Sequence, residues 1–349
     1  MTDPTALVDG SATPAELGFS MPAEWDRHAG CLMQWPSRRE LWRDRFDDAR
    51  ADYAVVARAI AAFEPVVMVC NPGDAGGVRD LCGAGVTPLE ISINDSWARD
   101  SGPVFVRDAA GALAVVSFGF NAWGNRWHPH DDDARLAVNV ADRLGLRVFR
   151  APFVLEGGAY AVDGEGTLIT TAQCLLDPNR NPTWSREDLE RGLRDHLGVT
   201  TVVWLPYGHS LDVGPAGTDG HVDGVAAYVG PGRVMLEAPT DPESADTGRA
   251  LENLDALLRS PDARGRTIEV TRIDPGASSV SLANHYLANG AVIVPVDGNP
   301  DESRALAQLA ALHPDREVVG VPGETLAFGG GGPHCITQQI PYGVDLGGL

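Results

Sequence analysis

The chain has 349 residues, of which 44% are hydrophobic and 21% charged, a composition that excludes low-complexity, fibrous and disordered proteins. Its 48 acidic and 27 basic residues give a formal net charge of −21, and every basic residue is an arginine. Nucleic acids and anionic membranes prefer the opposite sign, so we expect neither as a partner. A chain with this negative charge would attract a small cationic ligand, although the charge is also explained if it serves only to keep the protein soluble.

Five segments have the apolar spacing of amphipathic helices, at residues 39–63, 131–144, 185–197, 244–259 and 301–312. Several begin at Asp or Ser, as expected of helix N-caps. After each helix comes a short apolar run that predicts a strand: PVVMVC, LRVFRAPFV, TVVWLPY, TIEVTRI and REVVGVP. Two further stretches, GGAYAVDGEGTLITTA and DGVAAYVGPGRVMLEA, predict strand pairs with glycine-containing turns.

The last four predicted helices start roughly 57 residues apart, and a short helical stretch, GDAGGVRDLCG, lengthens the first interval. A unit repeated about five times predicts a radial arrangement. We therefore predict an α/β fold, a five-bladed pseudo-symmetric α/β propeller, as a single catalytic domain over residues 21–349. A loose polar lead-in over residues 1–20 precedes it. A parallel sheet divided between two domains is the alternative.

Five cysteines are scattered along the chain without CxxC spacing: Cys31, Cys70, Cys82, Cys174 and Cys335. An odd number at such spacing argues against a disulfide framework or a structural zinc site and favours a reducing compartment. The N-terminal residues show no export signal, and no apolar run approaches the roughly 20 residues that span a bilayer. We therefore expect a cytoplasmic protein.

One cysteine has an unusual setting, because Cys335 follows four consecutive glycines and Pro333 and His334. Glycine permits close approach of a ligand, so this thiol is a candidate nucleophile, or else a small buried hydrophobic residue. We give no weight to His334, since adjacent residues of a strand point to opposite faces.

Other candidate groups are a histidine and several carboxylates beside glycines. His221 and Asp223 lie two residues apart and share a face if a strand begins there, which suits acid/base catalysis or metal binding. Glu156 precedes two glycines and is able to orient a histidine. Asp100 ends the SWARD segment, where Trp97 offers a flat apolar wall.

The candidate groups together favour one kind of ligand. One cysteine, one histidine and several carboxylates suit a planar cation, because carboxylates grip a guanidinium through paired hydrogen bonds. His128, His130 and Asp131 form a second candidate set, which favours a metal-dependent hydrolase as a further alternative.

The chain resembles the agmatine deiminase family, a peptidylarginine-deiminase-type branch of the guanidino-group-modifying enzymes, from about residue 21 to 341. The matching blocks, in order, are MPAEWDRHAGCLMQWP, INDSWARDSGP, FNAWG, LEGGAYAVDGEGTLITTAQCLLDPNRNP, GHVDG, NHYLANGAVIVP and HCITQQIP. The resemblance implies the five-fold (pentein-type) propeller and hydrolysis of agmatine to N-carbamoylputrescine and ammonia through a covalent thiouronium on cysteine. It implies no metal or organic cofactor, and a place in polyamine metabolism.

The resemblance also implies a role for each residue that matches a family block. Cys335 would be the nucleophile, His221 the general acid/base, and Glu156 the partner of the histidine. Asp100 and Asp223 would hold the guanidinium, and Trp97 would line the pocket.

Several positions depart from the family pattern: Gly217, Asp219, Gly224, Leu282, His285, Gly332 and Pro333. Gly217 stands where the family usually has an acidic residue that helps to bind the far amine, and Asp212 or Asp219 is a candidate replacement. Deimination of another small guanidine, or amidino transfer to an amine, is therefore the alternative function, and a non-catalytic five-bladed binding protein is a third. Homologous enzymes often form homo-oligomers, so self-association is also an expectation.

Overall fold

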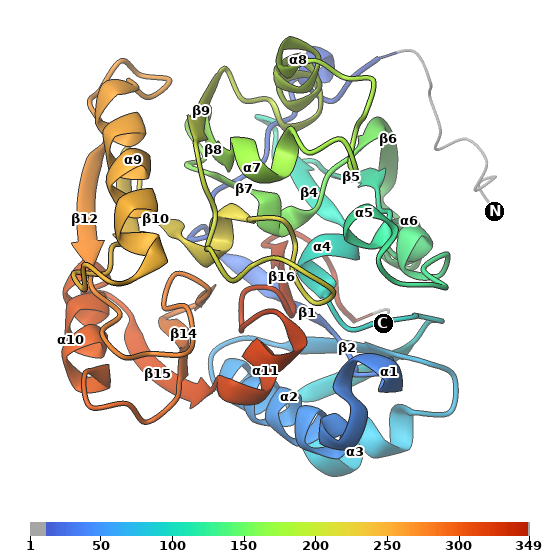
Figure 1. The fold of residues 1–349 in the computed structure, drawn as a ribbon. Helices are drawn as coiled ribbons and strands as arrows, with labels where there is room; N and C mark the ends of the chain where they lie inside the picture. The colour runs from blue at the N-terminus through green and yellow to red at the C-terminus, as the bar shows by residue number, and fades with distance from the viewer. Residues whose placement is uncertain (1–11, 348–349) are drawn as a thin grey trace.

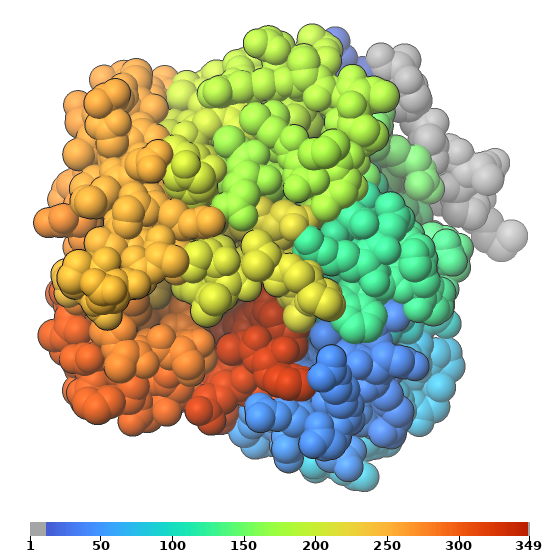
Figure 2. Space-filling view, viewed as in Figure 1, coloured from blue at the N-terminus to red at the C-terminus, as the bar shows by residue number. Residues whose placement is uncertain are grey.

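The structure is a computed structural model that describes residues 12–347, and the strands of that part of the chain form five sheets. Successive segments of the chain follow one another around the molecule, from the N-terminal segments at the lower right of the view to the C-terminal segments at the lower left (Figure 1). The surface shows the same cyclic order (Figure 2).

Four sheets share one plan, in which an antiparallel strand pair is followed by a helix and a parallel third strand. The first two contain β4 (Val104–Arg107), β5 (Leu113–Gly119), α6 (Asp133–Leu144) and β6 (Arg147–Val154), then β7 (Tyr160–Val162), β8 (Thr167–Thr171), α8 (Arg186–Leu197) and β9 (Thr201–Leu205). The next two contain β10 (Ala226–Gly230), β11 (Arg233–Glu237), α9 (Ala245–Arg259) and β12 (Glu269–Ile273), then β13 (Tyr286–Ala288), β14 (Ala291–Val296), α10 (Glu302–Leu312) and β15 (Glu317–Pro322).

The remaining sheet joins the two ends of the described chain. It has the order β16-β1-β2-β3, and its members are β16 (Thr337–Pro341), β1 (His28–Gln34), β2 (Val66–Cys70) and β3 (Val86–Glu90). The antiparallel pairing of β16 with β1 supplies the same plan as in the other sheets, with its first strand taken from the C-terminal part. The helices α2 (Phe46–Ala61) and α3 (Ala75–Cys82) complete it.

The packing of β16 is expected to stabilise this closure strongly. Ile340 is fully buried beside Leu32 and Val67, so Ile340→Ala removes packed methyl groups and leaves a cavity. We expect the free energy of unfolding to fall by about 2–5 kcal/mol, measured by urea denaturation. Leu81→Ala, at a half-exposed position of α3, is the control and is expected to change stability by less than about 0.5 kcal/mol. An equal effect of the two changes would contradict this role of β16.

Most predicted elements are confirmed within one to three residues. Ser185 forms a capping box with Asp188 at the start of α8, and the Ser244 side chain caps α9. The segment 39–63 was expected to be one helix but is broken into α1 (Arg39–Trp42), a short 3-10 turn and α2. The break occurs at Arg43, whose φ of 54° is incompatible with a continuous α-helix.

We predicted a loose lead-in over residues 1–20, and its first 11 residues lie outside the described part of the chain. From residue 12 the chain is attached to the body, which differs from a loose segment. A 3-10 turn, η2, spans Ala15–Leu17, Ser20 pairs with Arg107, and the Met21 amide donates to the Leu197 carbonyl at 2.9 Å. None of the helices described for this chain is long and apolar enough to cross a membrane.

Four short elements meet where the sheets approach one another. They are α4 (Ala98–Ser101), η4 (Gly157–Ala159), η5 (Val222–Gly224) and the turn that leads into β16. Beside them lie α5 (Ala122–Asn125), α7 (Ala172–Leu175) and α11 (Glu324–Gly329). Three of these elements carry a residue predicted to act on a substrate, and Glu156 directly precedes the fourth, η4, so the fold brings distant parts of the sequence to one place.

Candidate active site

Three predicted residues converge on the backbone of Gly158. A Cβ atom at this position would lie 2.5 Å from Nδ1 of His221, 2.8 Å from Oδ2 of Asp223 and 3.1 Å from Oδ1 of Asp100. Only glycine fits so close to three side chains. The GG sequence that follows Glu156 therefore has a steric purpose, since it allows these three polar groups to surround one point.

Cys335 lies buried beside this point. Its Sγ is 3.4 Å from Oδ2 of Asp223 and 3.1 Å from Nδ2 of Asn284, and its amide donates to Oδ1 of Asn284 at 3.3 Å. A Cβ atom on Gly331 would lie 2.6 Å from the Trp97 ring and 3.0 Å from Sγ of Cys335, so the indole and the thiol face each other across a glycine. Burial, with the nearby carboxylates of Asp223 and Asp100, raises the pKa of the Cys335 thiol well above its usual value.

Asp100 is held in place through both carboxylate oxygens. Nε1 of Trp123 donates to Oδ2 at 2.8 Å, and the Gly158 amide donates to Oδ1 at 2.9 Å. Burial raises the pKa of Asp100, and the charges of Asp223 and Glu156 add to this rise, while His221 opposes it. A cation placed between these carboxylates would relieve their repulsion.

His221 is not at the start of a strand, as we had expected, but precedes the 3-10 turn η5, and β10 begins only at Ala226. Its Nδ1 is 3.9 Å from Oδ1 of Asp100, and its Nε2 is 4.0 Å from Oε2 of Glu156. Neither ring nitrogen has a hydrogen-bond partner among residues 12–347. Although burial opposes it, the Asp100 carboxylate, together with Cys174 and Asp223, raises the pKa of His221 well above its usual value.

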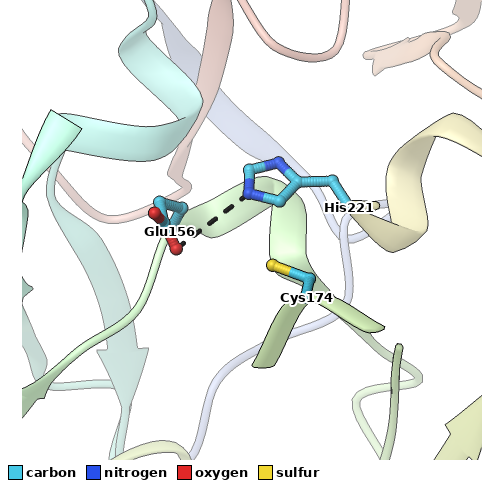
Figure 3. Close-up of side chains that lie close together, drawn as sticks. All are labelled: Glu156, Cys174 and His221. Atoms are coloured by element: carbon cyan, nitrogen blue, oxygen red, sulfur yellow. Dashed lines mark ion pairs between the residues drawn. The ribbon is translucent and has the colours of Figure 1, made fainter. Parts of the chain in front are cut away.

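Glu156 faces His221 because Arg180 occupies its other oxygen. Nε of Arg180 donates to Oε1 of Glu156 at 2.6 Å, while Oε2 has no partner among the described residues and points toward the imidazole (Figure 3). Cys174 lies close to the same ring, below it in the view (Figure 3). This geometry supports the predicted pairing of Glu156 with the histidine.

Glu156, Cys174 and His221 also form the one group in the described part of the chain with metal-ligand spacing, their candidate atoms lying within 4.8 Å of one another. The predicted alternative set of His128, His130 and Asp131 is not brought together in this way. The Arg180 guanidinium already neutralises Glu156, and burial raises the pKa of the Cys174 thiol, so both oppose a bound cation. We therefore assign no metal to this group.

Asp219 was expected to contact the substrate, but its carboxylate is engaged elsewhere. One oxygen pairs with Arg126, and the other accepts from Arg180 and Asn179, both at 2.9 Å. Asp212 is likewise engaged, since it accepts from the amides of the loop that precedes His221. Both carboxylates shape this loop, and Asp219 is not exposed in the cavity at Cys335.

A cavity of about 340 Å³, called here the Cys335 cavity, opens beside Cys335, His221 and Asp223. Its wall contains the carboxylates of Asp212 and Glu237, and no arginine among residues 12–347 lines it. Of the departures from the family pattern, Gly217, Gly224 and Gly332 lie in this wall, whereas Leu282, His285 and Pro333 lie outside it.

Sequence reasoning missed several residues that touch the predicted ones: Arg99, Arg180, Asn284 and His334. It also missed Glu24, which touches His334 and Arg99. His334 was set aside because neighbouring strand residues point apart, but residues 334–335 lie in a turn before β16. Both side chains therefore reach Asp223. No sequence pattern could have identified these residues, since nothing in the spacing links Glu24 to His334.

A buried cysteine, a histidine and converging carboxylates are typical of one class of protein, enzymes that act on a planar cationic group. The model of the Porphyromonas-type peptidyl-arginine deiminase family matches residues 20–341. The chain therefore belongs to this family, whose enzymes hydrolyse the C–N bond of an amidine group.

Named relatives extend the comparison over nearly the whole chain. The agmatine deiminase of a Pseudomonas aeruginosa strain is 40% identical over 96% of this chain and 99% of its own length. That of Pseudomonas fluorescens is 41% identical, over 95% and 97%. The solved agmatine deiminase of Enterococcus faecalis superposes with a TM-score of 0.90 at 34% identity, covering 95% of this chain and 98% of that one. The single-domain α/β fold is thus that of agmatine deiminase structures.

Proposed function

We propose that this protein hydrolyses agmatine to N-carbamoylputrescine and ammonia. The observation that carries the proposal is the convergence of His221, Asp223 and Asp100 on Gly158, with the Cys335 thiol 3.4 Å from Asp223. A guanidinium at this point meets a carboxylate on either side and a nucleophile beside its carbon. The relatives named agmatine deiminase add the identity of the substrate.

The Cys335 cavity supports a substrate with a cationic tail. Asp100 and Asp223 hold the guanidinium nitrogens. Asp100 and Trp97 line a second, smaller cavity of about 20 Å³ that also reaches Cys335, where the Trp97 ring, stacked on Trp42 at 5.9 Å, forms a flat wall. Beyond the guanidinium, the acidic wall and the lack of a lining arginine in the described chain disfavour the α-carboxylate of free arginine. Agmatine, which has an ammonium and no carboxylate, suits this wall.

The first half of the reaction forms a covalent intermediate. The Cys335 thiolate adds to the guanidinium carbon, and a C–S bond forms. His221, as imidazolium, gives its proton to one nitrogen as the C–N bond breaks, and ammonia leaves. An S-alkylthiouronium remains on Cys335, with its charge held by Asp100 and Asp223.

The second half returns the free enzyme. Neutral His221, oriented by Glu156 at 4.0 Å, takes a proton from water, and the hydroxide adds to the thiouronium carbon. The C–S bond then breaks, Cys335 leaves as thiolate, and the ureido product is released. The hydroxyl proton of the intermediate passes to solvent as the C–S bond breaks and ends on the released ammonia as ammonium. His221 is again an imidazolium, so protons and charges balance over the cycle.

The pH dependence follows from the two pKa shifts. The pKa of Cys335 is raised, so its thiolate in the free enzyme increases as the pH rises above neutrality. The pKa of His221 is also raised, so the imidazolium persists at neutral pH and is lost only at higher pH. We expect kcat/KM for ammonia release to follow a bell-shaped curve with its maximum on the alkaline side of neutrality. A maximum in acid would contradict this assignment.

The direct test is ammonia release from agmatine and from arginine by the purified protein. We expect turnover of agmatine and little or none of arginine. The Gly217 departure favours one alternative, deimination of a different monosubstituted guanidine, which would appear as turnover of that compound and not of agmatine. Formation of a new guanidine with an added amine, without ammonia, would instead identify an amidinotransferase.

We also infer that the five sheets are the blades of a five-bladed propeller within one catalytic domain. The shared plan of the four three-stranded sheets supports this, as does the β16–β1 pairing that joins the two ends of the chain. The attachment of residues 12–20 supports a domain that begins before residue 21. Five free, buried cysteines support a cytoplasmic location.

A further inference from the structure

Behind Asp223 lies a row of buried charged residues that the proposed reaction does not use. Nδ1 of His334 is 2.9 Å from Oδ2 of Asp223, and its Nε2 is 3.0 Å from Oε1 of Glu24. Nη1 of Arg99 donates to the same Glu24 oxygen at 3.0 Å. The order is therefore Arg99, Glu24, His334, Asp223, with opposite charges alternating when His334 is protonated.

These groups lie on the side of Asp223 that faces away from the substrate. Glu24, His334 and Asp223 line a small enclosed cavity of about 20 Å³, which has room for about one water molecule. Neither Glu24 nor His334 lines the Cys335 cavity, whereas Asp223 lines both. Glu24 and His334 therefore act on a substrate only through Asp223.

The opposite charges in this row stabilise one another although all four side chains lie in the interior or close to it. Burial opposes the charged forms, but Arg99 and His334 lower the pKa of Glu24 well below its usual range, and Glu24 and Asp223 raise that of His334. The ionisable groups that face His334 are Glu24, Asp223, Arg99 and His285, and burial lowers the pKa of His285 to about 4, so it stays neutral. The row is thus two cations and two anions.

We infer that His334 and Glu24 are positioning residues that fix the carboxylate of Asp223 for the guanidinium, an inference that rests on the proposed function. His334 and the Cys335 thiol both engage Oδ2 of Asp223, and no donor among the described residues reaches Oδ1. Oδ2, the oxygen that also faces Gly158, is therefore held in one direction, and Oδ1 keeps its acceptor capacity for a substrate nitrogen. Arg99 strengthens the arrangement, because its amide donates to the Cys335 carbonyl at 3.1 Å and its Nε donates to the His334 carbonyl at 3.3 Å.

The test compares His334→Gln and Glu24→Gln with His196→Gln. His196 is a matched control, since it is also buried but bonds only to the Gly192 carbonyl and packs on Phe153. For His334→Gln we expect kcat/KM for agmatine to fall about 100-fold, with KM raised as well as kcat lowered, because Asp223 loses its fixed orientation. Glu24→Gln keeps a hydrogen-bonding group and loses the charge, so we expect an intermediate loss of about 10-fold. The control is expected to stay within about twofold.

Alkylation of Cys335 by iodoacetamide without substrate gives a readout that does not depend on turnover. Removal of the imidazolium leaves the Asp223 charge uncompensated beside the thiol, so we expect slower alkylation at fixed pH in His334→Gln than in the wild type. This readout still tests the inference if the wild type proves not to use agmatine. Folded His334→Gln protein with wild-type kcat, KM and alkylation rate would overturn the inference. If His334→Gln does not fold, wild-type values in Glu24→Gln overturn it.

Discussion

Replacement of Cys335 by serine is expected to lower ammonia release from agmatine by at least about 10⁴-fold. The hydroxyl has nearly the size of the thiol, so the contacts with Asn284 and Asp223 are kept, but it is far harder to ionise between two carboxylates. Binding of agmatine should survive, because Asp100 and Asp223 remain. We expect the variant to bind agmatine in calorimetry while single-turnover mixing releases no ammonia.

A second cysteine substitution makes this result specific. Cys82 is also buried, at the end of α3, and lies outside the Cys335 cavity. Cys82→Ser should therefore keep the kcat of the wild type. Mass spectrometry of protein quenched during turnover should show the added mass of agmatine less ammonia on the Cys335 peptide and on no other. Substantial turnover by Cys335→Ser would mean that another group is the nucleophile.

Gly158→Ala is expected to reduce kcat/KM by about 100-fold or more, although it adds a single methyl group at a site distant in sequence from the nucleophile. The methyl group would lie within 3.1 Å of side-chain atoms of His221, Asp223 and Asp100, none of which is a flexible chain end free to move away. These side chains must shift, and the methyl group occupies the space beside the guanidinium. The kinetic constants for agmatine and the thermal stability of the variant measure the effect.

The matched control is a glycine with open space around it. A Cβ atom on Gly76, within α3, would meet nothing within 4 Å, and alanine favours a helix over glycine by about 0.5–1 kcal/mol. Gly76→Ala should therefore retain full activity with equal or higher stability. If Gly158→Ala kept wild-type kcat and KM, the guanidinium would have to bind elsewhere than at the point where the three side chains converge.

The arrangement of the elements was largely predictable because local signals agreed with the fold. Ser185 and Ser244 mark helix starts through capping that depends only on neighbouring residues, and both are confirmed. The break at Arg43 was not predictable, because the apolar spacing continues through it while the backbone changes direction. Likewise, the contact of Ser20 with Arg107 joins positions too far apart for any local pattern to reveal.

The candidate site was predictable to a smaller extent. Residue types and family blocks identified Cys335, His221 and Asp223, because thiol and imidazole chemistry depends on the groups themselves. Asp219 was misjudged, since its proximity to His221 in the sequence says nothing of the two arginines that pair with it. His334 was misjudged for a similar reason, because the turn before β16 overrides the alternation of a strand.

Short-range spacing and side-chain chemistry were enough to predict the elements, their repetition and the set of reactive groups. Which charges face the cavity and which face one another depends on long-range packing, and no local pattern in the sequence reveals it. Asp223 and Asp219 are both acidic residues beside His221, yet one lines the Cys335 cavity and the other pairs with Arg126 and Arg180. The difference arises because a buried carboxylate takes its role from the partners that folding brings to it.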